Sequence, residues 1–313
     1  MANKIKKIIM IVVIIILTFV TFLIITNPNK VDNLLYKITG NYYFSDINHK
    51  INKNELISIA QNKDYSNSIY YPYYELLNDN QKVVYQEIIR NANKYVTKFE
   101  IEVILTRDEL KETFYSVLYD HPEIFWLNLS YSISVNENNE IQSIELSYND
   151  IINDIENAKQ KFNDEIDKIV SEAKKQKTDY EKELYVHDTL IQLIEYDLNE
   201  EKSQNVYDAI TNKKAVCAEY TKLFQIIMMK LEIPTYYISG YANENHAWNL
   251  IELEDGFYNV DITWDDQKDK IIYKYFNVSD EMISKDHKRG EMSAKLIRNN
   301  GEKYLNKLST LYK

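Results

Sequence analysis

The chain has 313 residues, of which 45% are hydrophobic and 27% are charged, and its formal net charge is −11. This composition is sufficient for one large packed domain or two smaller ones, and it excludes wholesale disorder. The negative balance excludes the basic surface that nucleic-acid binding requires. A single cysteine, Cys217, excludes an intramolecular disulfide.

The first 26 residues combine a basic end with an apolar run. Three lysines lie within residues 1–7, and residues 8–25 contain no charged side chain. A run of this length reaches the span of a membrane-crossing helix, and no small-residue cleavage site follows it. The lysines favour a cytoplasmic N-terminus. We predict a single-pass signal anchor over residues 1–26 that leaves the rest of the chain extracellular; a cleaved signal peptide is the alternative.

Two regions follow the anchor. Residues 27–75 are weakly patterned and are interpreted as a stalk or linker. Residues 76–150 have the pattern of a small α+β module. In that module, Thr106 and Glu109 form a capping box that begins a helix. Alternating residue types on both sides of a polar turn, over residues 129–148, predict a β-hairpin.

Residues 151–313 are predicted to form the main domain. Two amphipathic helices open it, the second beginning at a capping box formed by Thr178 and Glu181. A third helix begins near Cys217 and ends before Pro234. Three strands are then predicted, at 235–241, 247–253 and 257–264.

Cys217 lies in the first turn of its predicted helix, where the helix dipole and the free N–H groups favour an anion. The same N–H groups can donate to an oxyanion. His246 begins the second predicted strand and Asp261 lies in the third. If Asp255 and Gly256 form a two-residue turn, Asp261 lies opposite Leu250, on the face of His246 but offset along the strand.

A cysteine, a histidine and an aspartate in this arrangement suit acyl transfer. The thiolate attacks a carbonyl carbon, the histidine manages the protons, and the carboxylate orients the imidazole. Each residue also has a structural alternative, since a lone cysteine can be a buried apolar side chain and a histidine at a strand start can be a packed one. Asp261 is harder to explain structurally, because a carboxylate in an apolar strand requires a partner.

Three motifs extend this reading by resemblance. They are Ala-Val-Cys-Ala-Glu-Tyr at 215–220, His-Ala-Trp-Asn at 246–249 and Tyr-Asn-Val-Asp-Ile-Thr-Trp at 258–264. Their order and spacing resemble the transglutaminase-like core of the papain-like cysteine enzymes, over about residues 180–285. The stretch at 120–126 resembles a module that precedes such domains in Gram-positive bacterial, membrane-anchored proteins.

The resemblance implies an α+β, papain-like fold in which the helix that carries the cysteine packs on an antiparallel sheet. It implies that Cys217 is the nucleophile, His246 the general base and acid, and Asp261 the residue that orients His246. Many family members have Gly where this chain has Glu219, and a carboxylate there opposes thiolate formation if it points inward. We interpret Glu219 as a solvated helix residue.

Other side chains receive weaker assignments. Trp248 and Tyr220 are candidates for substrate binding, with core packing as the alternative. His187 is expected to be structural, and His49 and His287 show no partner in the sequence. No spacing matches a metal site and no glycine-rich phosphate loop is present, so we expect neither a metal nor a cofactor.

The sequence thus predicts a membrane-anchored extracytoplasmic thiol enzyme. It would cleave or transfer peptide or isopeptide amides through a thioester on Cys217, and hydrolysis is favoured. The expected partner is a peptide, a protein or a cell-wall peptide. One alternative is an inactive transglutaminase-like binding or scaffold protein at the cell surface, and another is an N-acyltransferase that uses the same three residues.

Overall fold

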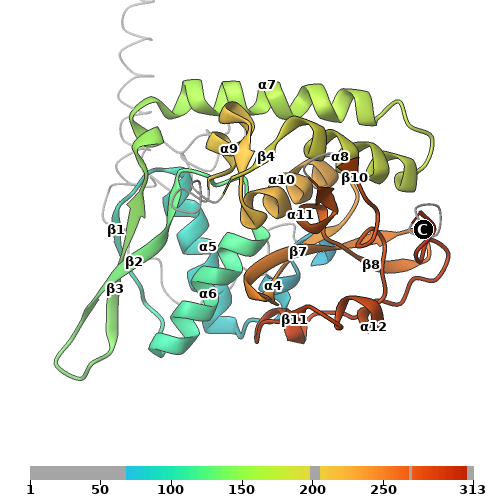
Figure 1. Ribbon diagram of the computed structural model, residues 1–313. Helices are drawn as coiled ribbons and strands as arrows, with labels where there is room; N and C mark the ends of the chain where they lie inside the picture. Colours follow the sequence, from blue (N-terminus) through green and yellow to red (C-terminus); the bar gives the residue numbers. More distant parts are fainter. Residues whose placement is uncertain (1–67, 198–204, 268–269, 309–313) are drawn as a thin grey trace, which may run out of the picture. The chain divides into compact units, whose positions relative to one another are not determined.

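The computed structural model describes residues 68–197, 205–267 and 270–308 (Figure 1). All of them belong to one compact unit, Leu56–Lys313. The predicted anchor at 1–26, and the predicted stalk as far as residue 67, lie outside the described residues. Within the described ranges, no helix is both long enough and apolar enough to cross a membrane.

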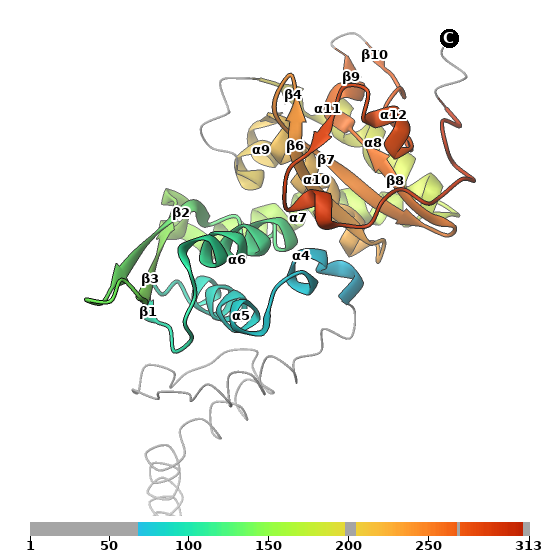
Figure 2. The ribbon, with the colours of Figure 1, turned by 90° about the horizontal axis from the view of Figure 1, so that it is seen from below.

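The N-terminal part of the described chain contains helices and a small sheet. Its elements are η1 (Ser68–Tyr70), α4 (Pro72–Glu75), α5 (Asp79–Asn93), β1 (Lys98–Glu100), α6 (Arg107–Asp120), β2 (Leu127–Val135) and β3 (Ile141–Tyr148). The strands form an antiparallel sheet in the order β1-β3-β2, so the predicted hairpin is present. The Thr106 capping box also forms, because Thr106 and Glu109 exchange hydrogen bonds. Figure 2 shows α4, α5 and α6 side by side.

Residues 72–75, which the sequence assigned to the stalk, are packed into this unit. Tyr73 is fully buried, and its hydroxyl donates to the Tyr237 carbonyl over 2.6 Å. Asp120 accepts hydrogen bonds from the backbone N–H groups of Tyr73 and Tyr74 and so caps α4. The chain before residue 76 therefore contributes to the core, which its weak periodicity did not reveal.

A group of helices and short strands follows. Its elements are η2 (Asp150–Asp154), α7 (Ile155–Ala173), α8 (Asp179–Leu193), β4 (Glu195–Tyr196), α9 (Val206–Asn212), β5 (Lys214–Ala215) and α10 (Cys217–Lys230). Helix α10 is buried along most of its length and packs on strands β6 and β7. Its buried residues include the polar Glu219, Thr221, Lys222 and Gln225, so the helix is covered well beyond its apolar stripe.

The central sheet has the antiparallel order β11-β6-β7-β8. The remaining elements are β6 (Thr235–Ala242), β7 (Glu244–Leu253), β8 (Gly256–Val260), α11 (Ile262–Asp265), β9 (Asp266–Gln267), β10 (Lys270–Ile271), α12 (Asp280–Ile283), β11 (Lys288–Arg289) and η4 (Ser293–Lys295). With the cysteine-bearing helix packed on this sheet, the predicted α+β arrangement is confirmed.

The turn between β7 and β8 differs from the predicted one. Leu253 pairs with Gly256, so the two turn residues are Glu254 and Asp255. Gly256 has a φ of +143°, a conformation that residues with a side chain rarely adopt. This register moves β8 by two residues along β7, and Asp261 comes correspondingly closer to His246.

The predicted third strand is also too long. Strand β8 ends at Val260, and Asp261 is the N-cap of α11, where its side chain accepts a hydrogen bond from the Trp264 N–H. An aspartate is a strong helix N-cap and a poor strand residue, which explains why the chain leaves the sheet here.

Candidate active site

Cys217 is the first residue of α10, and its side chain is partly exposed. It opens into a pocket of about 650 Å³ lined by residues of α6, α10, β6, β7 and β11. Ala218 also lines this pocket. The first N–H groups of a helix have no partner within the helix. The N-terminal end of α10, which attracts anions, therefore lies at this pocket.

His246 lies on β7, opposite Gly240 of β6, and faces the same pocket. Its Nε2 lies 2.8 Å from Asp261 Oδ2, which leaves Nδ1 for Cys217. Burial lowers the pKa of His246, but the charge and hydrogen bond of Asp261, with a smaller contribution from the Cys217 side chain, outweigh it and raise that pKa to about 10. The imidazole therefore favours its protonated form next to the thiol.

Asp261 is completely buried. Its Oδ1 accepts the Trp264 N–H over 3.1 Å, and its Oδ2 accepts from His246. Burial alone would raise its pKa, but the neighbouring imidazoles His246 and His287 hold the pKa below its usual value. Asp261 is thus an anion fixed in orientation by the first turn of α11.

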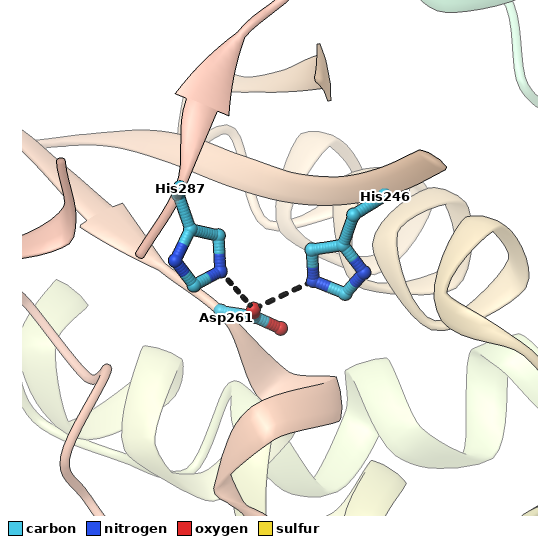
Figure 3. A group of neighbouring side chains, drawn as sticks. All are labelled: His246, Asp261 and His287. Atoms are coloured by element: carbon cyan, nitrogen blue, oxygen red, sulfur yellow. Dashed lines mark hydrogen bonds and ion pairs between the residues drawn. The ribbon is translucent and has the colours of Figure 1, made fainter. Parts of the chain in front are cut away.

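His287, which showed no partner in the sequence, also contacts Asp261 (Figure 3). Its Nε2 lies 2.9 Å from Asp261 Oδ2, the oxygen that His246 uses, and its Nδ1 lies 2.7 Å from Asp286 Oδ1. The only sequence signal was the adjacent Asp286-His287 pair. Its position depends on the path of the chain from β8 through α12 to β11, which local patterns do not specify.

The structure therefore brings together Cys217 at the N-terminus of α10, His246 near the start of β7 and Asp261 at the N-cap of α11. Residues 132–262 match the sequence model of the Transglutaminase-like superfamily, and these residues include all three.

These residues form a transglutaminase-like superfamily domain.

Two solved structures are similar to parts of the chain. One is a candidate cysteine protease from Cytophaga hutchinsonii, with 27% identity over 31% of this chain and 37% of the other, and a TM-score of 0.28. The second is a TGase, with 15% identity over 55% of this chain and 52% of the other, and a TM-score of 0.31. The chain thus spans about half or less of each. No curated protein matches the chain.

Glu219 is buried in the transglutaminase-like domain, so its interpretation as a solvated residue is wrong. Its Oε2 accepts the Val216 N–H over 3.2 Å, which caps the start of α10 from inside. The side chain of Lys222, one turn along the helix, is also buried. Burial lowers the pKa of Lys222, and the charge of Glu219 partly offsets that effect. The carboxylate thus has a structural function two residues from the thiol.

Trp248 and Tyr220, the candidates for substrate binding, do not line the pocket. Trp248 is 1% exposed and lies in the core, with its indole N–H donating to Asn259 Oδ1. Tyr220 is fully buried, and its hydroxyl contacts the Ile194 carbonyl and Asp266. Both side chains are packed in the domain interior, and their polar atoms have hydrogen-bond partners there.

The aromatic side chains that line the pocket with Cys217 are instead tyrosines that the sequence did not single out. Tyr119 of α6 stacks on Tyr237 of β6 at 4.8 Å, and Tyr241, 54% exposed, lies at the rim. The predicted N-terminal module therefore contributes Tyr119 to the pocket of the transglutaminase-like domain. From the sequence, the module and that domain are predicted as separate units.

Within the described ranges, His246, Asp261 and His287 are the group whose ligand atoms could meet a metal ion, since these atoms lie within 4.8 Å of one another. Imidazole nitrogens and a carboxylate suit Zn²⁺. Their nitrogen–oxygen separations of 2.8 and 2.9 Å are those of hydrogen bonds.

Proposed function

We propose that the chain is a thiol enzyme that cleaves or transfers a peptide or isopeptide amide through a thioester on Cys217. The observation that supports it most is a series of contacts. A partly exposed thiol lies at a pocket beside an imidazole with a raised pKa, and a buried carboxylate anion contacts that imidazole. This order matches the requirements of nucleophilic catalysis by cysteine.

The reaction follows from these positions. The Cys217 thiolate attacks the amide carbonyl carbon, and the carbonyl electron pair moves onto oxygen. The N–H groups of Cys217 and Ala218 at the start of α10 lie at the pocket and are suited to hold that oxyanion. The C–N bond then breaks, the protonated His246 gives its proton to the leaving amine, and a thioester remains.

Water or a second amine resolves the thioester. Neutral His246 takes a proton from that nucleophile, which attacks the thioester carbon and releases the Cys217 thiolate beside a protonated imidazole. Asp261 holds the imidazole so that Nδ1 faces the thiol throughout. Hydrolysis requires only water to reach the pocket, so we propose it as the principal outcome.

A surface location completes the proposal. The apolar run at 8–25 and the lysines before it support a signal anchor, and a body with a net negative charge supports a position outside an anionic membrane. The substrate would then be a peptide, a surface protein or a cell-wall peptide. Carbonate-resistant sedimentation with membranes, lost on deletion of residues 1–26, is the expected result.

Alkylation by an iodoacetamide probe tests the chemistry directly, because Cys217 is the only thiol in the chain. We expect rapid labelling at pH 6, where an ordinary thiol is almost entirely protonated, and a loss of at least about tenfold in His246→Ala. Cys217→Ser gives the background. Labelling only at alkaline pH, unchanged by His246→Ala, would refute the proposal.

That negative result would favour an inactive binding or scaffold protein. The buried carboxylate of Glu219 is the observation on which this second candidate rests, since it lies two residues from the thiol and a negative charge disfavours a thiolate.

A further inference from the structure

His287 has a carboxylate at each of its two ring nitrogens. Nε2 lies 2.9 Å from Asp261 Oδ2, and Nδ1 lies 2.7 Å from Asp286 Oδ1. The imidazole has no exposed surface, whereas the side chain of Asp286 is 32% exposed. A neutral imidazole has a single N–H and can donate to only one of these partners.

Both partners favour the carboxylate form. Burial raises the pKa of Asp286, but the hydrogen bond from the Tyr275 hydroxyl, with the charge of Lys274 among the other contributions, brings it below the usual value. The pKa of Asp261 is likewise lowered, against the opposing effect of burial, first by the charge and the hydrogen bond of His246. Two carboxylates that only accept hydrogen bonds require a proton on each nitrogen of His287.

The surroundings of His287 also suit a cation. The ring centroids of Trp264, Trp248 and Tyr275 lie 4.5, 5.1 and 5.3 Å from that of the imidazole. The rings are tilted or edge-on to the imidazole, at interplanar angles of 58°, 78° and 54°. An aromatic ring attracts a positive charge that lies over its face. The Tyr275 hydroxyl donates to the other oxygen of Asp286 over 2.6 Å and fixes that carboxylate in turn.

We propose that His287 is a positioning residue of this site, a doubly protonated imidazolium that holds Asp261 as an anion aimed at His246. The proposal rests on the proposed function. When His246 gives its proton to a leaving amine, Asp261 loses one cationic neighbour, and His287 remains as the other. A buried carboxylate is therefore never left without a charged partner during the reaction.

This role predicts a shift in pH dependence. The titratable and charged groups that face His287 directly or through its partner are Asp261, His246, Asp286, Tyr275 and Lys274. Removing the His287 cation takes a positive charge from the site, so the thiolate is less stabilised and the acid limb of the Cys217 alkylation profile moves to higher pH. A purely structural role would lower the rate without moving that limb.

The test compares two variants. His287→Phe keeps an aromatic ring among Trp264, Trp248 and Tyr275, and Asp286→Asn removes the negative charge of the partly exposed carboxylate at His287 Nδ1. His121→Phe is the matched control, because His121 is also buried, stacked on Tyr71 and bonded through Nδ1 to a carboxylate, that of Glu123. All variants are made in the full chain. Circular dichroism establishes that each is folded.

In His287→Phe we expect alkylation at pH 6 to slow by about tenfold and the acid limb to move to higher pH. Asp286→Asn should move the limb in the same direction by a smaller amount, and His121→Phe should leave the profile unchanged. Nitrogen-15 spectra of histidine-labelled protein at neutral pH should show a ring with two N–H protons that disappears in His287→Phe.

Folded His287→Phe and Asp286→Asn proteins that label like the wild type would overturn the inference. So would purified protein that holds one Zn²⁺ per chain and loses it in His287→Phe, because the trio would then be a metal site. If wild-type Cys217 itself reacts as an ordinary thiol, the proposed function fails. The nitrogen-15 spectrum then decides the inference about His287 by itself: one N–H proton on the ring overturns it, and two support it.

Discussion

Replacing Asp261 with Asn removes a buried negative charge and changes the shape of the side chain very little. In the native protein Oδ2 accepts from His246 at 2.8 Å and from His287 at 2.9 Å, while Oδ1 accepts the Trp264 N–H at 3.1 Å. An amide has one oxygen. Whichever way it turns, its NH₂ group faces at least one N–H donor, so one buried donor loses its acceptor.

The magnitude follows from these contacts. A buried donor left without a partner costs about 1–3 kcal/mol, and breaking a buried ion pair costs about 3–5 kcal/mol. We expect Asp261→Asn to lower the free energy of unfolding by about 3–5 kcal/mol. For a domain of this size that corresponds to a fall in Tm of about 6–20 °C.

The chemical effect is separate from the loss of stability. Without the Asp261 charge, the pKa of His246 falls toward its ordinary value, and the protonated imidazole beside Cys217 is lost near pH 7. Alkylation of Cys217 at pH 6–7 should slow by at least about tenfold. Asp265→Asn is a matched control, since Asp265 is equally buried in α11 but bonds to His187 and the Tyr275 N–H.

Urea unfolding and iodoacetamide labelling of both variants measure the two effects. We expect both proteins to be destabilised and only Asp261→Asn to label slowly. A loss of stability below about 1 kcal/mol, together with wild-type labelling in Asp261→Asn, would refute the reasoning from buried charge and donor count.

Two further predictions concern stability at alkaline pH and the start of α10. Against the opposing effect of burial, its two carboxylate partners hold the pKa of His187 at about 9, while burial raises that of Glu183 to about 8. Between pH 6.5 and 9 the folded state therefore binds more protons than the unfolded state. The free energy of unfolding, measured in urea, should be lower at pH 9 than at pH 6.5, and this decrease should be smaller in His187→Gln. Glu219→Gln keeps an acceptor for the Val216 N–H and removes a negative charge near the thiol; labelling at pH 6 should rise by about two- to tenfold, whereas an unchanged rate would mean that Lys222 already neutralises this carboxylate.

The local elements of this fold follow from short-range chemistry. Thr106 with Glu109, and Thr178 with Glu181, begin helices as their capping boxes indicate. The β7–β8 register did not follow, because two adjacent turns were compatible with the residues Glu254 to Gly256, and pairing across the sheet decided between them.

For the candidate site, the sequence by itself determined the residue types, their order and the position of Cys217 at a helix start, since these depend on neighbours along the chain. Only the tertiary structure decided that Asp261 leaves the sheet, that Glu219 is buried and that His287 joins Asp261 from 26 residues further along. These contacts join segments distant in sequence. The charges and hydrogen bonds that outweigh burial and set the protonation of His246 and Asp261 therefore exist only once those segments have packed together.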